Sequence, residues 1–180
     1  MATAPTPTLT SEFATALREL MLQGLAQEME TTSKVIAAIP DGERDYRPDP
    51  KARTAWELAW HIAAEDVVFL DQIVEGKFAF PDPRYDNQRP KTAAELAAWY
   101  RTNFARALDK IRTLTPQQLT TPLDFFGIMT LPRVQFLGLV SNHSVHHRGQ
   151  LSTYLRPMGS KVPQIYGGNA DEPFEMPASA

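Results

Sequence analysis

Cysteine is absent from this sequence of 180 residues. The chain therefore has no disulfide framework, no thiolate nucleophile and no thiolate metal site, so a transition metal in this protein must be held by imidazole or carboxylate groups. The sequence also lacks a run of the roughly 18 apolar residues that a membrane-spanning helix requires. Its first ten residues have neither the positive region nor the apolar region of a secretory signal. We expect a cytoplasmic protein with no membrane partner.

An excess of positive charge is also missing, because 18 Lys and Arg residues stand against 21 Asp and Glu residues, for a net charge of -3. Proteins that bind nucleic acid neutralise phosphates with a basic surface, so no nucleic-acid partner is expected. The hydrophobic share of 43% and the charged share of 22% are those of an ordinary soluble globular chain. We predict a single domain over residues 11–171, between a flexible N-terminus (residues 1–10) and a flexible C-terminal tail (residues 172–180).

The 15 prolines are grouped in clusters that leave four long gaps between them. Proline inside a helix removes a hydrogen bond and clashes with the preceding turn, so these gaps are where long helices can form. Each gap carries apolar residues at helical spacing. The gaps span residues 8–39, 51–80, 91–115 and 133–156. Four helices with short or proline-rich connections predict an all-α fold, a four-helix bundle.

Some boundaries and faces of these helices are also predicted. Thr92 and Glu95 form a capping-box pattern at the start of the third helix, and Thr130 or Leu131, ahead of Pro132, marks the start of the fourth. The connection FPDPRYDNQRP after the second helix is too long for a tight turn and predicts either a crossover or a loop at the rim. The inward stripe of the first helix is assigned to Phe13, Leu17, Leu20, Met21, Gly24, Glu28, Thr31, Val35 and Ile39.

The four histidines lie in only two of the four predicted helices, His61 in the second and His143, His146 and His147 in the fourth. Residues four apart stack on one face of a helix, so the imidazoles of His143 and His147 can converge on one ion. Both continue an apolar stripe, and His61 lies on or beside the inward face of its own helix. One histidine facing an i, i+4 pair gives three nitrogen ligands and leaves a coordination position open, as in catalytic zinc sites.

The four histidines also allow other interpretations. A single inward histidine is more often a hydrogen-bonded core residue, but burying three without a shared purpose is costly. His146 points about 100° away from His147, so we assign it to the surroundings of the site or to the surface. The zincin pattern is excluded because Ser144 follows His143, and no Glu-x-x-His pair of a di-iron bundle is present. A histidine-only site suits zinc, nickel or ferrous iron, and availability favours zinc.

Glu65 is the candidate general base. It lies one helical turn beyond His61 on the same face, where burial would raise its pKa toward the useful range. The alternative is an ordinary exposed glutamate. Four further polar residues flank the histidines and are candidates for orienting the imidazoles: Asp66, Asn142, Arg148 and Gln150. Among them we favour Asn142 and Gln150, with His146 in the same supporting role.

Two segments carry a family resemblance: W-E-L-A-W-H at residues 56–61 and S-N-H-S-V-H-H-R-G-Q-L at residues 141–151. Together they resemble the DinB-like superfamily of metalloenzymes, and P-Q-I-Y-G at residues 163–167 is similar to the end of many such chains. The resemblance covers roughly residues 11–171. It implies an up-down bundle with a crossover connection and one divalent metal held by His61, His143 and His147, the same three residues that the helical spacing selects.

The relatives in this superfamily include S-transferases that use bacillithiol or mycothiol, a mycothiol-dependent maleylpyruvate isomerase, and damage-inducible proteins without an assigned reaction. The resemblance therefore implies an enzyme, foremost a thiol-dependent S-transferase in which the metal activates a thiol or water that attacks a small-molecule electrophile. A metal-assisted hydrolase or isomerase is a lesser alternative. The main alternative is a non-catalytic, metal-stabilised bundle that acts in stress or damage response.

Binding partners follow from the same implied chemistry. A low-molecular-weight thiol would be an acidic cofactor, and the arginines of the two connections are candidates to bind it: Arg44, Arg47, Arg84 and Arg89. A homodimer that packs helix faces together is the default expectation for a small bundle.

Overall fold

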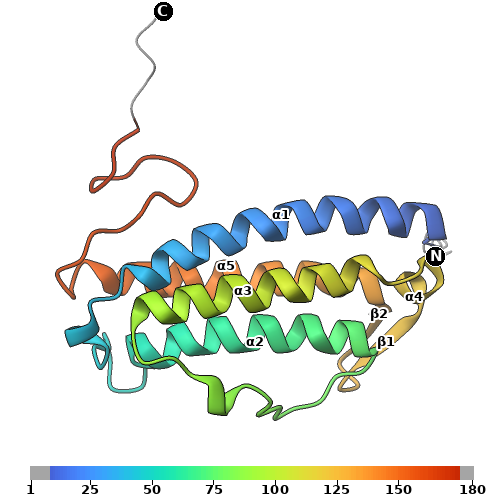
Figure 1. The fold of residues 1–180 in the computed structure, drawn as a ribbon, viewed down its shortest axis with the longest axis horizontal. Helices are drawn as coiled ribbons and strands as arrows, with labels where there is room; N and C mark the ends of the chain where they lie inside the picture. Colours follow the sequence, from blue (N-terminus) through green and yellow to red (C-terminus); the bar gives the residue numbers. More distant parts are fainter. Residues whose placement is uncertain (1–8, 175–180) are drawn as a thin grey trace, which may run out of the picture.

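The fold was determined as a computed structural model, which describes residues 9–174. Four long helices pack together along their lengths (Figure 1): α1 (Ser11–Ala37), α2 (Ala55–Glu75), α3 (Ala93–Arg112) and α5 (Phe136–Leu155). They confirm the predicted four-helix bundle. Residues 1–8 of the predicted flexible N-terminus and residues 175–180 of the predicted flexible tail lie outside the described range.

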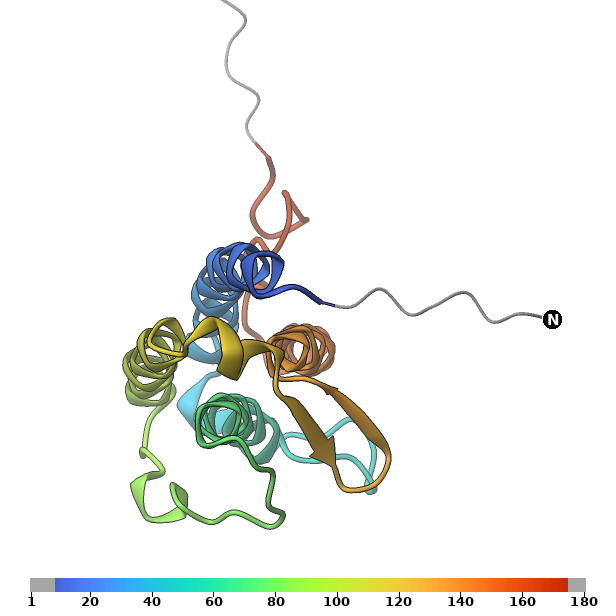
Figure 2. The ribbon, with the colours of Figure 1, turned by 90° about the vertical axis from the view of Figure 1, so that its right-hand side faces the viewer.

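The order of the helices in space differs from their order in the chain. Viewed along the bundle, α1 lies opposite α2, and α3 lies opposite α5 (Figure 2). Helices α1 and α5 run in one direction, and α2 and α3 run in the other (Figure 1). The segment between α2 and α3, which contains a short 3-10 helix η2 (Asp86–Gln88), therefore returns along the length of the bundle. It is the crossover connection, one of the two alternatives that the sequence left open.

Threonine side chains fix where the helices begin. The Thr54 hydroxyl accepts a hydrogen bond from the Glu57 backbone N–H, and the Glu57 carboxylate accepts one from the Thr54 N–H in return. Thr92 and Glu95 do the same at the start of α3, which confirms the predicted capping box. Because α2 starts at this defined point, His61 is held in its second turn.

The predicted start of the fourth helix is wrong. A short helix, α4 (Pro116–Thr120), and a hairpin of β1 (Pro122–Phe125) and β2 (Met129–Pro132) precede α5, and Thr130 and Leu131 belong to β2. Pairing of Leu123 with Leu131 sets the register of the hairpin. A 3-10 turn, η3 (Arg133–Gln135), then leads into α5. The apolar residues at helical spacing all follow Pro132, so this pattern could not predict the hairpin that precedes it.

The predicted inward face of α1 is also wrong in its first half. Phe13 is 59% exposed and Leu20 is 67% exposed. The buried side chains of this helix are instead Ala14, Leu22, Leu25, Met29, Thr32, Ser33, Val35 and Ile36. Apolar residues occur on more than one face of this half of α1, so spacing does not select the buried face.

The segment after α5 folds back against the bundle. Gly159 adopts the left-handed conformation, with φ of 77°, and the Ser160 N–H donates to the Leu155 carbonyl, which ends the helical region. The Tyr166 hydroxyl then donates to Glu28 of α1 at 2.9 Å. In residues 9–174 no helix is long and apolar enough to cross a membrane.

Candidate metal centre

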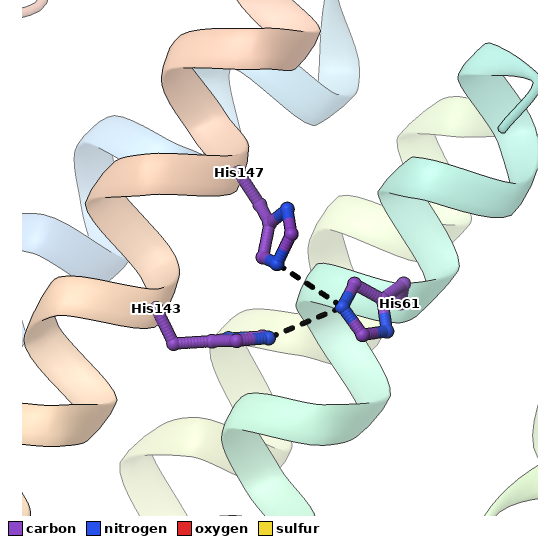
Figure 3. Close-up of side chains that lie close together, drawn as sticks. All are labelled: His61, His143 and His147. Atoms are coloured by element: carbon purple, nitrogen blue, oxygen red, sulfur yellow. Dashed lines mark hydrogen bonds between the residues drawn. The ribbon is translucent and has the colours of Figure 1, made fainter. Parts of the chain in front are cut away.

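Three of the four histidines meet between α2 and α5 (Figure 3). The Nε2 atom of His61 lies 3.2 Å from Nε2 of His143 and 3.2 Å from Nε2 of His147. His143 and His147 lie one turn apart on α5 and point at His61 on the facing helix α2. One nitrogen from each ring lies within 4.8 Å of the other two, and all three side chains are partly buried. The structure thus brings together the three residues that the sequence selected.

Hydrogen bonds on the far side of two rings fix which nitrogen carries the proton. His143 Nδ1 lies 2.7 Å from an oxygen of Asp66, and His147 Nδ1 lies 2.8 Å from the side-chain oxygen of Gln150. These oxygens accept hydrogen bonds, so we assign the N–H to Nδ1 in both rings. In the neutral rings, Nε2 then presents a lone pair toward His61.

This arrangement fits a divalent cation. A single N–H on His61 can donate with good geometry to only one of two facing lone pairs, whereas a cation accepts a lone pair from all three rings at once. The nitrogen separations of 3.2 Å are close to the value of about 3.4 Å for two ligands that are each about 2.1 Å from a tetrahedral zinc ion. The residues present therefore fit a mononuclear site with three nitrogen ligands.

The surroundings of His61 and His147 favour the neutral form of these two rings, which is the form that binds a metal. Burial, followed by the positive charge of Arg53 and the neighbouring rings, lowers the pKa of His61 to about 3. Burial also lowers the pKa of His147. Since a metal binds only the unprotonated imidazole, the site does not have to release a proton from His61 at neutral pH.

A buried polar network supports His143. Asp66 is fully buried, and its second oxygen accepts a hydrogen bond of 2.7 Å from the Tyr100 hydroxyl. Burial, together with the charge of Asp66, raises the pKa of Tyr100 well above its usual value, so this hydroxyl stays a donor. The network continues through Ser144 and Thr32 to the buried guanidinium of Arg148. Asp66 is thereby held in one orientation, and it holds the His143 ring in turn.

The predicted supporting residues are only partly brought to the site. Gln150 contacts His147, and its amide nitrogen lies 3.2 Å from Nε2 of the exposed His146. The His146 ring also packs edge to face against the His147 ring, with the ring centroids 4.8 Å apart. Asn142 is exposed and makes no hydrogen bond to the three histidines within the described residues. Asp66, and not the favoured candidate Asn142, is the residue that orients the His143 ring.

Glu65 lies beside the histidines and not in contact with them. It is partly buried and lines a small, mainly apolar cavity of about 70 Å³ with three phenylalanines of α2 and the hairpin region, among others, and with the polar side chains of Gln72 and Asp82. Burial, opposed by the charges of His143 and Arg53, raises the pKa of its carboxyl group. Among the hydrogen bonds of residues 9–174, none joins Glu65 to a histidine. Its catalytic role stays a prediction.

The loop arginines have structural contacts. Arg84 pairs with Glu75 and Asp82, and the guanidinium groups of Arg44 and Arg89 lie over the Trp56 ring at 5.2 Å and 5.5 Å. The contacts of Arg84 and Arg89 join the crossover connection to α2, and that of Arg44 joins the α1–α2 connection to α2. All three arginines thus have structural roles.

Comparison with known proteins identifies relatives of this chain. The model of the DinB family matches residues 10–175. The structure of a DinB-like protein from Bacillus cereus is 32% identical, with a TM-score of 0.69 over 82% of this chain and 97% of the other. The uncharacterized protein YjoA from Bacillus subtilis is 29% identical over 71% of this chain and 82% of its own.

A more distant structure shares the fold. YfiT from Bacillus subtilis, described as "a probable metal-dependent hydrolase with an unusual four-helix bundle topology", is 17% identical, with a TM-score of 0.64 over 88% of this chain and 95% of its own. At this identity the likeness concerns the fold.

Proposed function

We propose that this chain, which belongs to the DinB family, is a divalent-metal-dependent enzyme whose ion is held by His61, His143 and His147. The observation that carries the proposal is the convergence of three Nε2 atoms on one point, with the Nδ1 atoms of two rings bound by Asp66 and Gln150. Three protein ligands leave room for a further ligand, which is typical of catalytic sites. We expect the ion to be zinc.

We further propose that the reaction is the transfer of a thiol to a small-molecule electrophile. A divalent ion in this site supplies Lewis-acid chemistry, which lowers the pKa of a thiol or water that binds to it. In this proposal Glu65 accepts the proton of that nucleophile, and the burial that raises the pKa of its carboxyl group supports this role. Asp66 keeps the His143 ring in the orientation that the ion requires. With water as the nucleophile, the same residues would serve a hydrolase.

Metal content is the first test. Protein purified without a histidine tag and without added metal should contain about one divalent ion per chain, and chelation should lower its melting temperature, because an ion that binds only the folded state stabilises it. The matched pair of variants is His61→Ala, which should lose the ion, and His146→Ala, which should keep it. A chain without metal that also fails to bind added zinc or nickel contradicts the proposal.

Activity is the second test. The metal-loaded protein should conjugate thiols to a generic electrophile such as monochlorobimane faster than His61→Ala does. A parallel panel of esters and amides tests hydrolysis. Turnover of the esters or amides without thiol conjugation would assign the site to a hydrolase, and a full complement of metal with no turnover of either panel would favour a structural ion.

A further inference from the structure

A cavity of about 400 Å³ adjoins the histidine cluster at the end of the bundle where α2 begins. His147 and Gln150 line it from α5, and Lys51 and Arg53 line it from the segment that precedes α2. Tyr154, one turn beyond Gln150, adds a hydroxyl group to the same wall. A molecule in this cavity would thus lie directly against one of the three proposed metal ligands.

The charge that lines this cavity is entirely positive. Neither Lys51 nor Arg53 makes a side-chain hydrogen bond or an ion pair with any residue of the described chain, and no acidic side chain is among the residues of the lining. Other arginines of the protein are neutralised, as Arg106 is by Asp71 and Arg148 is by Glu28. The positive charge of Arg53 also contributes to the lowered pKa values of His61 and His147.

We propose that Lys51 and Arg53 bind the carboxylate of a small molecule in this cavity, so that the enzyme selects a substrate or co-substrate that bears an anionic group on the His147 side of the site. A guanidinium offers several donors to a carboxylate, and an ammonium adds a second charge. Gln150 and Tyr154 supply further polar contacts. The choice of reactive group rests on the proposed function, whereas the recognition of the anion does not.

The cavity at the other side of the histidines has the opposite character. Glu65 lies one turn farther along α2 than His61, and the aromatic rings of its small cavity are joined by two polar side chains, Gln72 and the acidic Asp82, but by no cationic one. A carboxylate would lose its hydration there without gaining a cationic partner. The two cavities therefore predict that the anionic end of the ligand lies toward Arg53 and its apolar end toward the β1–β2 hairpin.

The test uses pairs of probes that differ only in charge. N-acetylcysteine and its amide form one pair, and N-acetylalanine and its amide form a second pair without the thiol. Binding is measured by calorimetry or by NMR titration, on the protein as purified and after removal of metal. We expect the acids to bind at least about tenfold more tightly than the amides, with a preference that weakens as salt is raised.

Variants assign the preference to the two cations. The double variant Lys51→Gln, Arg53→Gln should bind acid and amide within about twofold of each other. Arg101→Gln, which removes a guanidinium that pairs with Glu30 between α1 and α3, is the matched control and should keep the preference. Equal binding of acid and amide by the parent, absence of measurable binding of either acid, or a preference that survives the double variant would each overturn the proposal.

Measurements with and without metal, and with and without a thiol on the probe, distinguish a failure of the anion site from a failure of the proposed function. A preference for N-acetylalanine over its amide in metal-free protein supports the anion site even if the chain proves to bind no metal. A protein that binds metal and conjugates thiols but treats acid and amide alike retains the function and loses the anion site. If metal increases the affinity for N-acetylcysteine but not for N-acetylalanine, the ligand that carries the carboxylate also carries the thiol. That result would support both the anion site and the proposed function.

Discussion

Helix α2 carries two buried aspartates, Asp66 and Asp71, whose surroundings are similar in one respect and different in another. Each accepts a hydrogen bond from a tyrosine, Asp66 from Tyr100 and Asp71 from Tyr85. Asp71 also receives a charged hydrogen bond of 2.9 Å from Arg106 of α3. Asp66 instead contacts Nδ1 of His143 at 2.7 Å.

The difference lies in where the balancing positive charge comes from. Around Asp71 the chain supplies it through Arg106 and Lys110, and this cluster joins α2 to the parallel helix α3. Around Asp66 the chain supplies imidazoles whose remaining nitrogens face one another across 3.2 Å. The charges of the first cluster are balanced by the chain itself, whereas the second cluster would be completed by the cation that we propose to bind there.

The largest expected effect comes from removing a histidine of the second cluster. His143→Ala leaves two nitrogen ligands, so the affinity for zinc should fall by more than about a hundredfold, beyond the range of 10 to 100 for residues that only support a ligand. Far-UV circular dichroism should be unchanged, because the side chain is partly exposed. Competition with a chromogenic chelator measures the affinity. An affinity within tenfold of the parent would show that His143 is not a ligand.

The comparison between the two aspartates can be tested directly with Asp66→Asn and Asp71→Asn. Asp66→Asn should lower zinc affinity by about 10- to 100-fold, since the amide is a weaker acceptor and no longer holds the orientation of the His143 ring as firmly. Asp71→Asn should leave the affinity within about twofold. Its effect should be on stability, with the free energy of unfolding lower by about 1–3 kcal/mol, because Arg106 and Tyr85 lose one of the two acceptor oxygens and the negative charge that they share.

Zinc competition and urea denaturation of both metal-free variants measure these two quantities. The comparison fails if Asp71→Asn loses metal as strongly as Asp66→Asn, since the two clusters would then not be separate.

The sequence predicted the helices and the histidine triad because both depend on local spacing. His143 and His147 are neighbours through helix geometry, and the prolines mark where α1, α2 and α3 cannot continue. Asp66 was one of several candidates that spacing could not rank, and Asn142 was preferred. The partners of Asp66 are Tyr100 on α3 and His143 on α5, so its role depends on how three helices pack, which no local pattern contains.

An intermediate effect is expected at Glu65, which lies next to Asp66 in the chain and points into the apolar cavity. Glu65→Gln should keep the fold and the metal but lower the rate of thiol conjugation by about tenfold or more, the lower range for the loss of a general base. Glu30→Gln on α1, which removes a carboxylate far from the site, is the control and should keep the parent rate. Equal rates for Glu65→Gln and the parent would remove Glu65 from the mechanism.

The smallest expected effect concerns how the free energy of unfolding changes at acid pH. One residue can change the number of protons taken up on unfolding by at most about one. Burial lowers the pKa of His61 from an ordinary value near 6.5 to about 3. Between these values the unfolded chain binds a proton that the folded chain does not, so the stability of the metal-free protein falls as pH drops below 6.5. Burial alone would raise the pKa of Asp71, but hydrogen bonds from Arg106 and Tyr85 lower it below its ordinary value of 3.8.

The two clusters should therefore act in different pH windows. His61→Gln should flatten the loss of stability between about pH 6.5 and 4, because the glutamine takes up no proton on unfolding. Asp71→Asn should leave that slope unchanged and flatten only the part below about pH 4, where the unfolded aspartate binds its proton first. Urea denaturation of the chelator-treated proteins at half-unit steps of pH measures both slopes. If His61→Gln retains the parent slope above pH 4, the surroundings of His61 do not lower its pKa. Burial would then not explain why this ring is unprotonated and able to bind a metal.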